Sequence, residues 1–226
     1  MTRRTTLTAA AMASVLVATV LAAPASAAGL SPAVSSMATA GTIGEQRTAL
    51  RAAYSRSLQE ISAAQADART LSRGQSGAFA TAVAGMTVTM RAAAAAVTSA
   101  TNQAQVDAAA KLVRTESIRS ATAKQAATKL VRLQTMRREQ VAIANKALQD
   151  KLAGTITGPV YAQQEARATA FSTLLSVAAT AQLQTVGKAV PSPALTVEPA
   201  FTSLKAGTGS ITAAPGWTGF PGGFVM

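Results

Sequence analysis

Apolar residues recur at intervals of three or four over most of the chain between positions 45 and 186. This spacing is typical of helices that bury one face, because an α-helix turns once every 3.6 residues or so. In residues 45–72, one such face is formed by Leu50, Tyr54, Leu58, Ile61, Ala64, Ala68 and Leu71. The pattern therefore predicts a first amphipathic helix over residues 45–72.

A second predicted helix covers residues 78–100 and follows a turn at residues 74–77, which contain two glycines. Its apolar positions have a heptad-like spacing: Phe79, Val83, Met86, Met90 and Val97. Asn102 is a suitable N-terminal cap for a third helix over residues 103–153. Because no Gly or Pro interrupts the chain near this cap, one continuous helix across the boundary is the alternative.

The fourth predicted helix covers residues 160–186 and follows a break at Gly158 and Pro159. Proline is favoured in the first turn of a helix, where its missing N–H costs nothing. The aligned positions of this helix are Tyr161, Ala168, Phe171, Leu175, Ala178 and Gln182. Four such helices joined by short turns predict an all-α fold, an elongated up-and-down bundle with a seam made mainly of alanine.

The segments on either side of the predicted helical domain, residues 45–186, have a different composition. Residues 28–44 are small and polar with interspersed Gly and Pro, which predicts a flexible leader. From residue 187 the chain is rich in Pro and Gly, which do not continue a helix. Residues 187–226 are therefore predicted to form a disordered tail.

The start of the chain has the three-part layout of a secretory signal peptide. Arg3 and Arg4 precede an apolar stretch over residues 7–22, and Ala25 and Ala27 fit the small-residue pockets of a signal peptidase. We therefore predict cleavage after residue 27, an extracellular or cell-wall location, and no membrane-spanning segment in the mature chain. An uncleaved membrane anchor is the alternative, but the apolar stretch is short for a full span.

The chain is strongly cationic, with 21 Lys and Arg residues against 9 Asp and Glu residues. Removal of the signal peptide takes away two arginines and no acid, which leaves a net charge of +10. Such a charge attracts polyanions, including phosphate-bearing wall polymers, anionic lipid and nucleic acid. The alternative is that the cations only keep an alanine-rich surface in solution.

Much of this charge lies on the predicted helix over residues 103–153. Projected at about 100° per residue, its cations share one arc: Lys111, Arg114, Arg119, Lys129, Arg132, Arg137 and Lys151. We expect the first six of these, here called the basic face, to contact an anionic partner such as an envelope polymer or a lipid surface. Nucleic acid is disfavoured because no aromatic residue interrupts the basic series to stack on bases.

The same helix contains an internal echo, because the sequence Lys-Leu-Val-Arg at residues 111–114 recurs at residues 129–132. The two copies are eighteen residues apart, which is about five helical turns, so they point in the same direction. An apolar arc lies next to the basic face. Four apolar residues fall outside it and predict contact with another helix or with a second molecule: Ile118, Leu133, Met136 and Ile143.

The chain contains neither His nor Cys. The commonest general base, the thiolate nucleophile, disulfides and the usual zinc, copper and haem ligands are therefore missing together. Glu60 and Asp67 are seven residues apart on one helix face, but a bare carboxylate pair is weak evidence for an active site. We predict no enzymatic activity, no catalytic residue, no metal and no cofactor.

These observations predict an exported, non-catalytic helical protein with a binding or structural role in the cell envelope or outside the cell. Self-association through the apolar residues outside the arc is a further expectation. The alternative function is a carrier that encloses a small apolar ligand between its helices. The side chains that would line such a cavity are Phe79, Met86, Met90, Phe171 and Leu175, for which ordinary core packing is the simpler interpretation.

Overall fold

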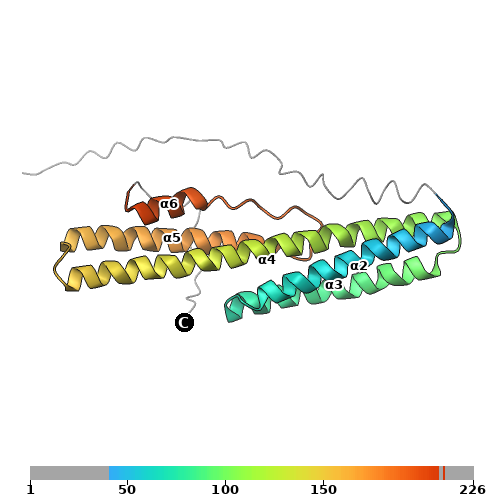
Figure 1. Cartoon of the computed structure of the whole chain (residues 1–226), viewed down its shortest axis with the longest axis horizontal. Helices are drawn as coiled ribbons and strands as arrows, with labels where there is room; N and C mark the ends of the chain where they lie inside the picture. Colours follow the sequence, from blue (N-terminus) through green and yellow to red (C-terminus); the bar gives the residue numbers. More distant parts are fainter. Residues whose placement is uncertain (1–40, 209–210, 212–226) are drawn as a thin grey trace, which may run out of the picture.

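The computed structural model describes residues 41–208 and residue 211 (Figure 1). Its helices are α2 (Ile43–Ala68), α3 (Arg73–Ser99), α4 (Gln103–Leu152), α5 (Gly158–Thr185) and α6 (Glu198–Ala206). No strand occurs in this part of the chain, so the prediction of an all-α fold is confirmed. The predicted signal peptide, residues 1–27, lies outside the described residues, as does most of the predicted leader.

The long helix α4 is the axis of the molecule (Figure 1). Its 50 residues span about 75 Å at 1.5 Å per residue. Helices α2 and α3 pack along its first half, and α5 and α6 pack along its second half. The predicted elongated up-and-down bundle of about four long helices is therefore confirmed. The sequence did not predict that α2 packs on the first half of α4 and α5 on the second half.

Side-chain contacts fix the directions of these helices. Gln46 of α2 hydrogen-bonds Gln103 at the start of α4, and the hydroxyl groups of Ser57 and Ser117 lie 3.0 Å apart farther along the same pair. Helices α2 and α4 are therefore parallel, and α3, which connects them along the chain, runs in the opposite direction. Helix α5 is antiparallel to α4, because the short loop at residues 153–157 joins the two.

Local capping explains where several helices begin. Thr42 and Glu45 form a capping box, in which the Thr42 backbone N–H donates to the Glu45 carboxylate over 2.7 Å. Asn102 accepts a hydrogen bond of 3.0 Å from the backbone N–H of Gln105. This cap confirms that α3 and α4 are separate helices and not one continuous helix. Pro159 lies in the first turn of α5, as its missing N–H favours.

The predicted turn at residues 74–77 is wrong, because α3 already begins at Arg73. The chain turns earlier, at residues 69–72, immediately after α2. A glycine inside a helix costs only about 1 kcal/mol relative to alanine. The short connection lets Leu71 and Phe79 both enter the core, and their burial offsets that cost.

The interior consists of two apolar clusters. The main core takes apolar side chains from all five helices, and its largest members are Phe79, Phe171, Phe201, Met90, Leu130 and Met136. The second core lies between α2, α3 and the start of α4 and comprises Leu50, Ala53, Ala93, Val97, Ala100, Val106, Ala109 and Val113. Between them along α2 and α4 lies a polar layer that consists of Ser57, Glu60, Glu116, Ser117 and Ser120.

The folded body continues beyond residue 186, where the predicted disordered tail begins. Residues 187–206, here called the C-terminal strap, double back so that α6 lies beside α5 (Figure 1). Phe201 of α6 is 2% exposed and stacks on Phe171, with the ring centroids 5.4 Å apart. This aromatic contact overrides the local Pro and Gly content. Residues 209–210 and 212–226 of the predicted tail lie outside the described residues.

The two copies of the Lys-Leu-Val-Arg echo offer a matched test of core packing. Leu130 is fully buried in the main core, whereas the equivalent Leu112 is 45% exposed. We expect Leu130→Ala to lower the free energy of unfolding by about 2 to 4 kcal/mol and Leu112→Ala by less than about 1 kcal/mol. Urea unfolding followed by circular dichroism at 222 nm measures both. Equal losses would contradict the described burial.

Candidate functional site

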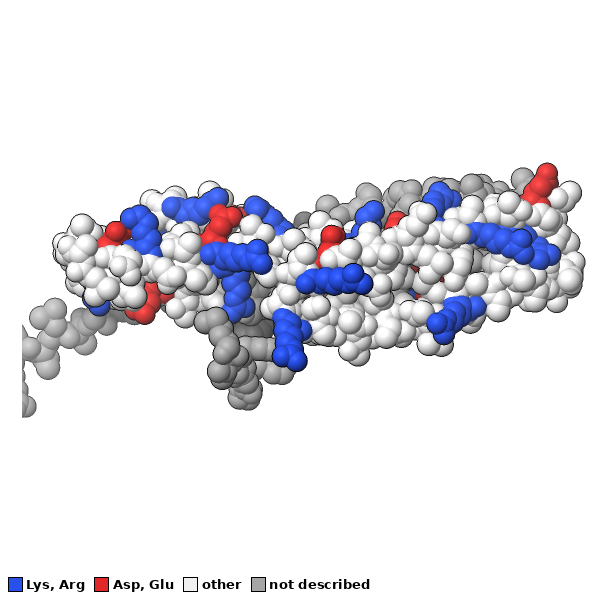
Figure 2. All heavy atoms as spheres, turned by 60° about the horizontal axis from the view of Figure 1, so that its bottom comes forward, with Lys and Arg blue, Asp and Glu red and all other residues white. Residues whose placement is uncertain are grey.

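All six residues of the basic face lie on α4. Lys111, Arg114, Arg132 and Arg137 are exposed, whereas Arg119 and Lys129 are partly buried. On the face drawn in Figure 2, Lys and Arg side chains are distributed over the length of the molecule, with uncharged surface and a few Asp and Glu side chains between them. The structure thus presents spaced cations along a rod.

Lys129 is held by the C-terminal strap. Its ammonium nitrogen donates to the Ser192 carbonyl oxygen (3.0 Å), the Ser192 hydroxyl (3.0 Å) and the Pro193 carbonyl oxygen (2.7 Å). These three acceptors account for the three N–H groups of a lysine. All three acceptors are neutral, and partial burial lowers the pKa of Lys129 below its usual value.

Arg132 is also engaged by the C-terminal strap. Its Nε and one terminal nitrogen donate to the two carboxylate oxygens of Glu198, at 3.1 and 3.3 Å. The hydrogen bonds that Arg132 donates to Glu198, and the negative charge of that carboxylate, together raise the pKa of Arg132. The guanidinium carbon also lies 6.0 Å from the centre of the Phe201 ring. Both ion-pair side chains remain nearly half exposed, so solvent screens the pair.

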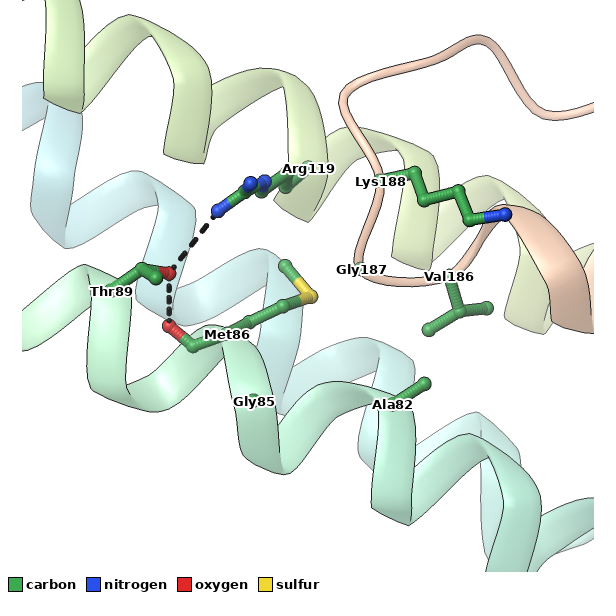
Figure 3. Close-up of a pocket in the computed structure, with 8 residues that line it drawn as sticks. All are labelled: Ala82, Gly85, Met86, Thr89, Arg119, Val186, Gly187 and Lys188. Carbon is green, nitrogen blue, oxygen red and sulfur yellow. Dashed lines mark hydrogen bonds between the residues drawn. The ribbon is translucent and has the colours of Figure 1, made fainter.

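Arg119 pairs with a buried acid of the polar layer. Its guanidinium nitrogen lies 2.8 Å from Glu116, whose side chain is only 5% exposed. The same nitrogen donates to the Thr89 hydroxyl over 3.3 Å. Figure 3 shows the guanidinium pointing toward Thr89, which in turn donates to the Met86 carbonyl oxygen. Arg119 therefore connects α4 with α3.

A surface pocket of about 280 Å³ lies beside this contact (Figure 3). Its walls come from α3, from Arg119 and from residues 186–188 at the start of the C-terminal strap. Lys188 lines the pocket, but its ammonium group points away from Arg119. The one guanidinium in the wall is already paired with Glu116, so Lys188 is the other cation of the pocket lining.

The apolar residues outside the apolar arc of α4 mostly contact other helices of the same chain. Leu133 and Met136 are buried in the main core, and Ile143 packs against it. Ile118 is half-buried. Of the two predicted explanations, contact with another helix of the same chain therefore accounts for three of these four residues, and no second molecule is needed for them.

The proposed lining of a carrier cavity also belongs to the main core. Phe79, Met86, Met90, Phe171 and Leu175 are each at most 3% exposed and pack within one cluster. Of these residues, Met86 alone also borders the surface pocket. A cavity lined by all five would require the helices to separate.

Glu60 accepts a hydrogen bond of 2.7 Å from Ser120 and is thereby part of the polar layer. In the described part of the chain, no group of three or more Asp and Glu side chains is arranged to hold a metal ion. Among the described helices, α3 alone is long and apolar enough to cross a membrane. Helix α3 contributes Phe79, Val83 and Met86 to the main core, but only 28% of its most apolar 18-residue window is buried.

Sequence reasoning missed the strap that covers part of the basic face. The one local clue is that Glu198 is the only acid among residues 187–208, and no periodicity connects it to Arg132. We compared the chain with known proteins once these contacts were established. No protein-family model, no curated protein and no solved structure matches it.

Proposed function

We propose that this protein is exported and binds, without catalysis, an anionic polymer or lipid surface of the cell envelope. The observation that carries the proposal is the charge of the helical body. Residues 41–208 contain 19 basic and 9 acidic residues, a net charge of +10, on a narrow rod built around α4. The shared chemistry of the two candidate partners is a row of closely spaced phosphates or carboxylates.

The spacing of the cations favours an extended partner over a compact one. In 0.1 M salt, exposed charges interact strongly only within about 10 Å. Cations spaced along the rod therefore act on successive charges of a polymer or on a charged plane. This type of attraction weakens steeply as salt concentration rises.

Within the basic face, three residues support the proposal most directly. Lys111, Arg114 and Arg137 are exposed on α4. Arg119 and Lys129 are partly buried in contacts within the chain, and Arg132 is paired with Glu198. The first three are thus the side chains of the basic face that are most accessible from solvent.

The test compares two variants of the mature chain that each lose three cations. One carries Lys111→Gln, Arg114→Gln and Arg137→Gln on α4. The matched control removes three exposed arginines from α2 and α3, with the changes Arg51→Gln, Arg56→Gln and Arg91→Gln. We expect the α4 variant to lose at least about tenfold in affinity at 50 mM salt, and the control less, since each close cation contributes a fraction of that factor.

Binding is measured separately on phosphatidylglycerol vesicles and on a soluble polyglycerol phosphate, which distinguishes a lipid surface from a polymer. Circular dichroism verifies that both variants keep their helicity. Unchanged retention of the α4 variant would refute a role for these residues. Equal losses in both variants would show that total charge, and not the face of α4, holds the partner.

The carrier function has less support from the described geometry. Its five candidate lining residues are packed against one another in the main core. The surface pocket is bordered by Arg119 and Lys188 as well as by apolar groups, which is a poor lining for a purely apolar ligand.

A further inference from the structure

The C-terminal strap occupies the second Lys-Leu-Val-Arg copy of α4. Lys129, the first residue of this copy, donates to Ser192 and Pro193 of the strap. Arg132, its last residue, pairs with Glu198. The first copy, residues 111–114, presents exposed Lys and Arg side chains. The strap thus contacts both cations of the second of two segments with identical sequence.

None of the groups that Lys129 contacts in the described part of the chain is a counter-ion. Its three acceptors are two carbonyl oxygens and a hydroxyl, none of which is anionic. Partial burial of an ammonium group among neutral oxygens is unfavourable relative to contact with a phosphate or a carboxylate. An anionic partner would therefore improve on the interactions that the strap provides.

Helix α6 is held by two buried apolar side chains, by a hydrogen bond of 2.6 Å from the Arg167 guanidinium to the Ser203 carbonyl oxygen, and by ion pairs near solvent. Phe201 and Leu204 are buried, whereas the Arg132–Glu198 and Lys205–Glu139 pairs are exposed. Exposed ion pairs add little to stability. A helix of nine residues is too short to persist in water by itself, so α6 remains helical only while it is docked.

We propose that the C-terminal strap competes with the anionic partner for Lys129 and Arg132, and that partner binding at these residues releases α6 from α5. This inference rests on the proposed function, because it assumes a partner with closely spaced anions. Release exposes Phe171, which Phe201 covers in the docked state. The position of the strap then determines whether Lys129 and Arg132 are available to the partner.

The test uses two substitutions that remove the same charge from different places. Glu198→Gln removes the carboxylate that pairs with Arg132. Glu165→Gln removes an exposed carboxylate from α5 and leaves the strap contacts intact. With soluble inorganic polyphosphate at 50 mM salt, we expect Glu198→Gln to bind at least about threefold more tightly than Glu165→Gln, because one more cation is available.

Amide hydrogen exchange supplies the second measurement. Addition of polyphosphate to the unsubstituted protein is expected to speed exchange in residues 198–206 and to leave exchange in the middle of α4 unchanged. Protection of residues 198–206 that persists in the bound protein, or equal affinity of the two variants, would overturn the competition. If neither variant nor the unsubstituted protein binds polyphosphate, the proposed function and this inference both fail.

Discussion

Phe171→Ala is expected to lower the free energy of unfolding by about 3 to 5 kcal/mol, the usual cost of removing a fully buried aromatic ring. Phe171 is 0% exposed and lies in the main core, where α5 meets α4 and α6. The surrounding seam is rich in alanine, whose short side chains cannot move in to fill the space of a ring. Urea unfolding monitored at 222 nm gives the loss directly.

Phe201→Ala is the matched control, because it removes the other ring of the same stacked pair. We expect a loss less than half as large, since α6 can undock while α2 to α5 stay folded. If Phe201→Ala destabilises the protein as much as Phe171→Ala, the strap is an inseparable part of the fold. That outcome would also count against release of α6 by a partner.

Arg119→Met is expected to cost about 3 to 5 kcal/mol, the range observed when one member of a buried ion pair is removed. The substitution leaves Glu116 almost fully buried and removes the cation with which it pairs. One of its carboxylate oxygens already has no hydrogen-bond partner in the described structure. The remaining carboxylate would therefore keep its desolvation cost and lose the attraction that offsets it.

The double substitution Glu116→Leu with Arg119→Met separates this explanation from lost packing. Apolar side chains of similar volume remove both charges, so most of the stability is expected to return. The four proteins form a double-mutant cycle, from which the coupling between the two residues is obtained by urea unfolding. A single Arg119→Met variant within about 1 kcal/mol of the parent would mean that water reaches Glu116.

The polar layer around Glu116 gives the bundle its alignment. Ser57 contacts Ser117, and Ser120 donates to Glu60, one helical turn farther along both α2 and α4. A shift of α2 along α4 would break these pairs and leave buried polar groups without partners. Alanine-lined helices lack large side chains to fix their relative position, so this layer supplies the specificity that the apolar seam does not.

Helix positions were predictable because they depend on local features. The periodicity of three and four, the cap at Asn102 and the proline at residue 159 identified four helices whose described bounds differ by only a few residues from the expected ones. The prediction of which residues lie on the buried face of each helix was less accurate. Leu58 was placed on the buried face of the first helix but is 43% exposed, whereas the polar Ser57 is buried against α4.

The basic face shows where local reasoning ends. The sequence predicts that its residues share one long helix, which the structure confirms. Several of the groups that its cations contact, however, belong to segments far away in the chain. Arg119 meets Thr89 of α3, and Arg132 meets Glu198, sixty-six residues later. Such pairs leave no periodic pattern, and a short helix with one anchoring aromatic resembles a disordered tail in composition.

The two Lys-Leu-Val-Arg copies show why the surroundings of each α4 residue could not be predicted from the sequence. The two copies have the same sequence and the same orientation around the helix axis, so the sequence alone predicts the helix and the positions of its charges. Packing then treated the copies differently, burying Val113 and exposing Leu112 in one, and burying Leu130 in the other. Helices α2 and α3 pack on the first half of α4, and α5 and α6 pack on the second half. Which residues of each copy are buried therefore depends on tertiary packing and not on the local four-residue sequence.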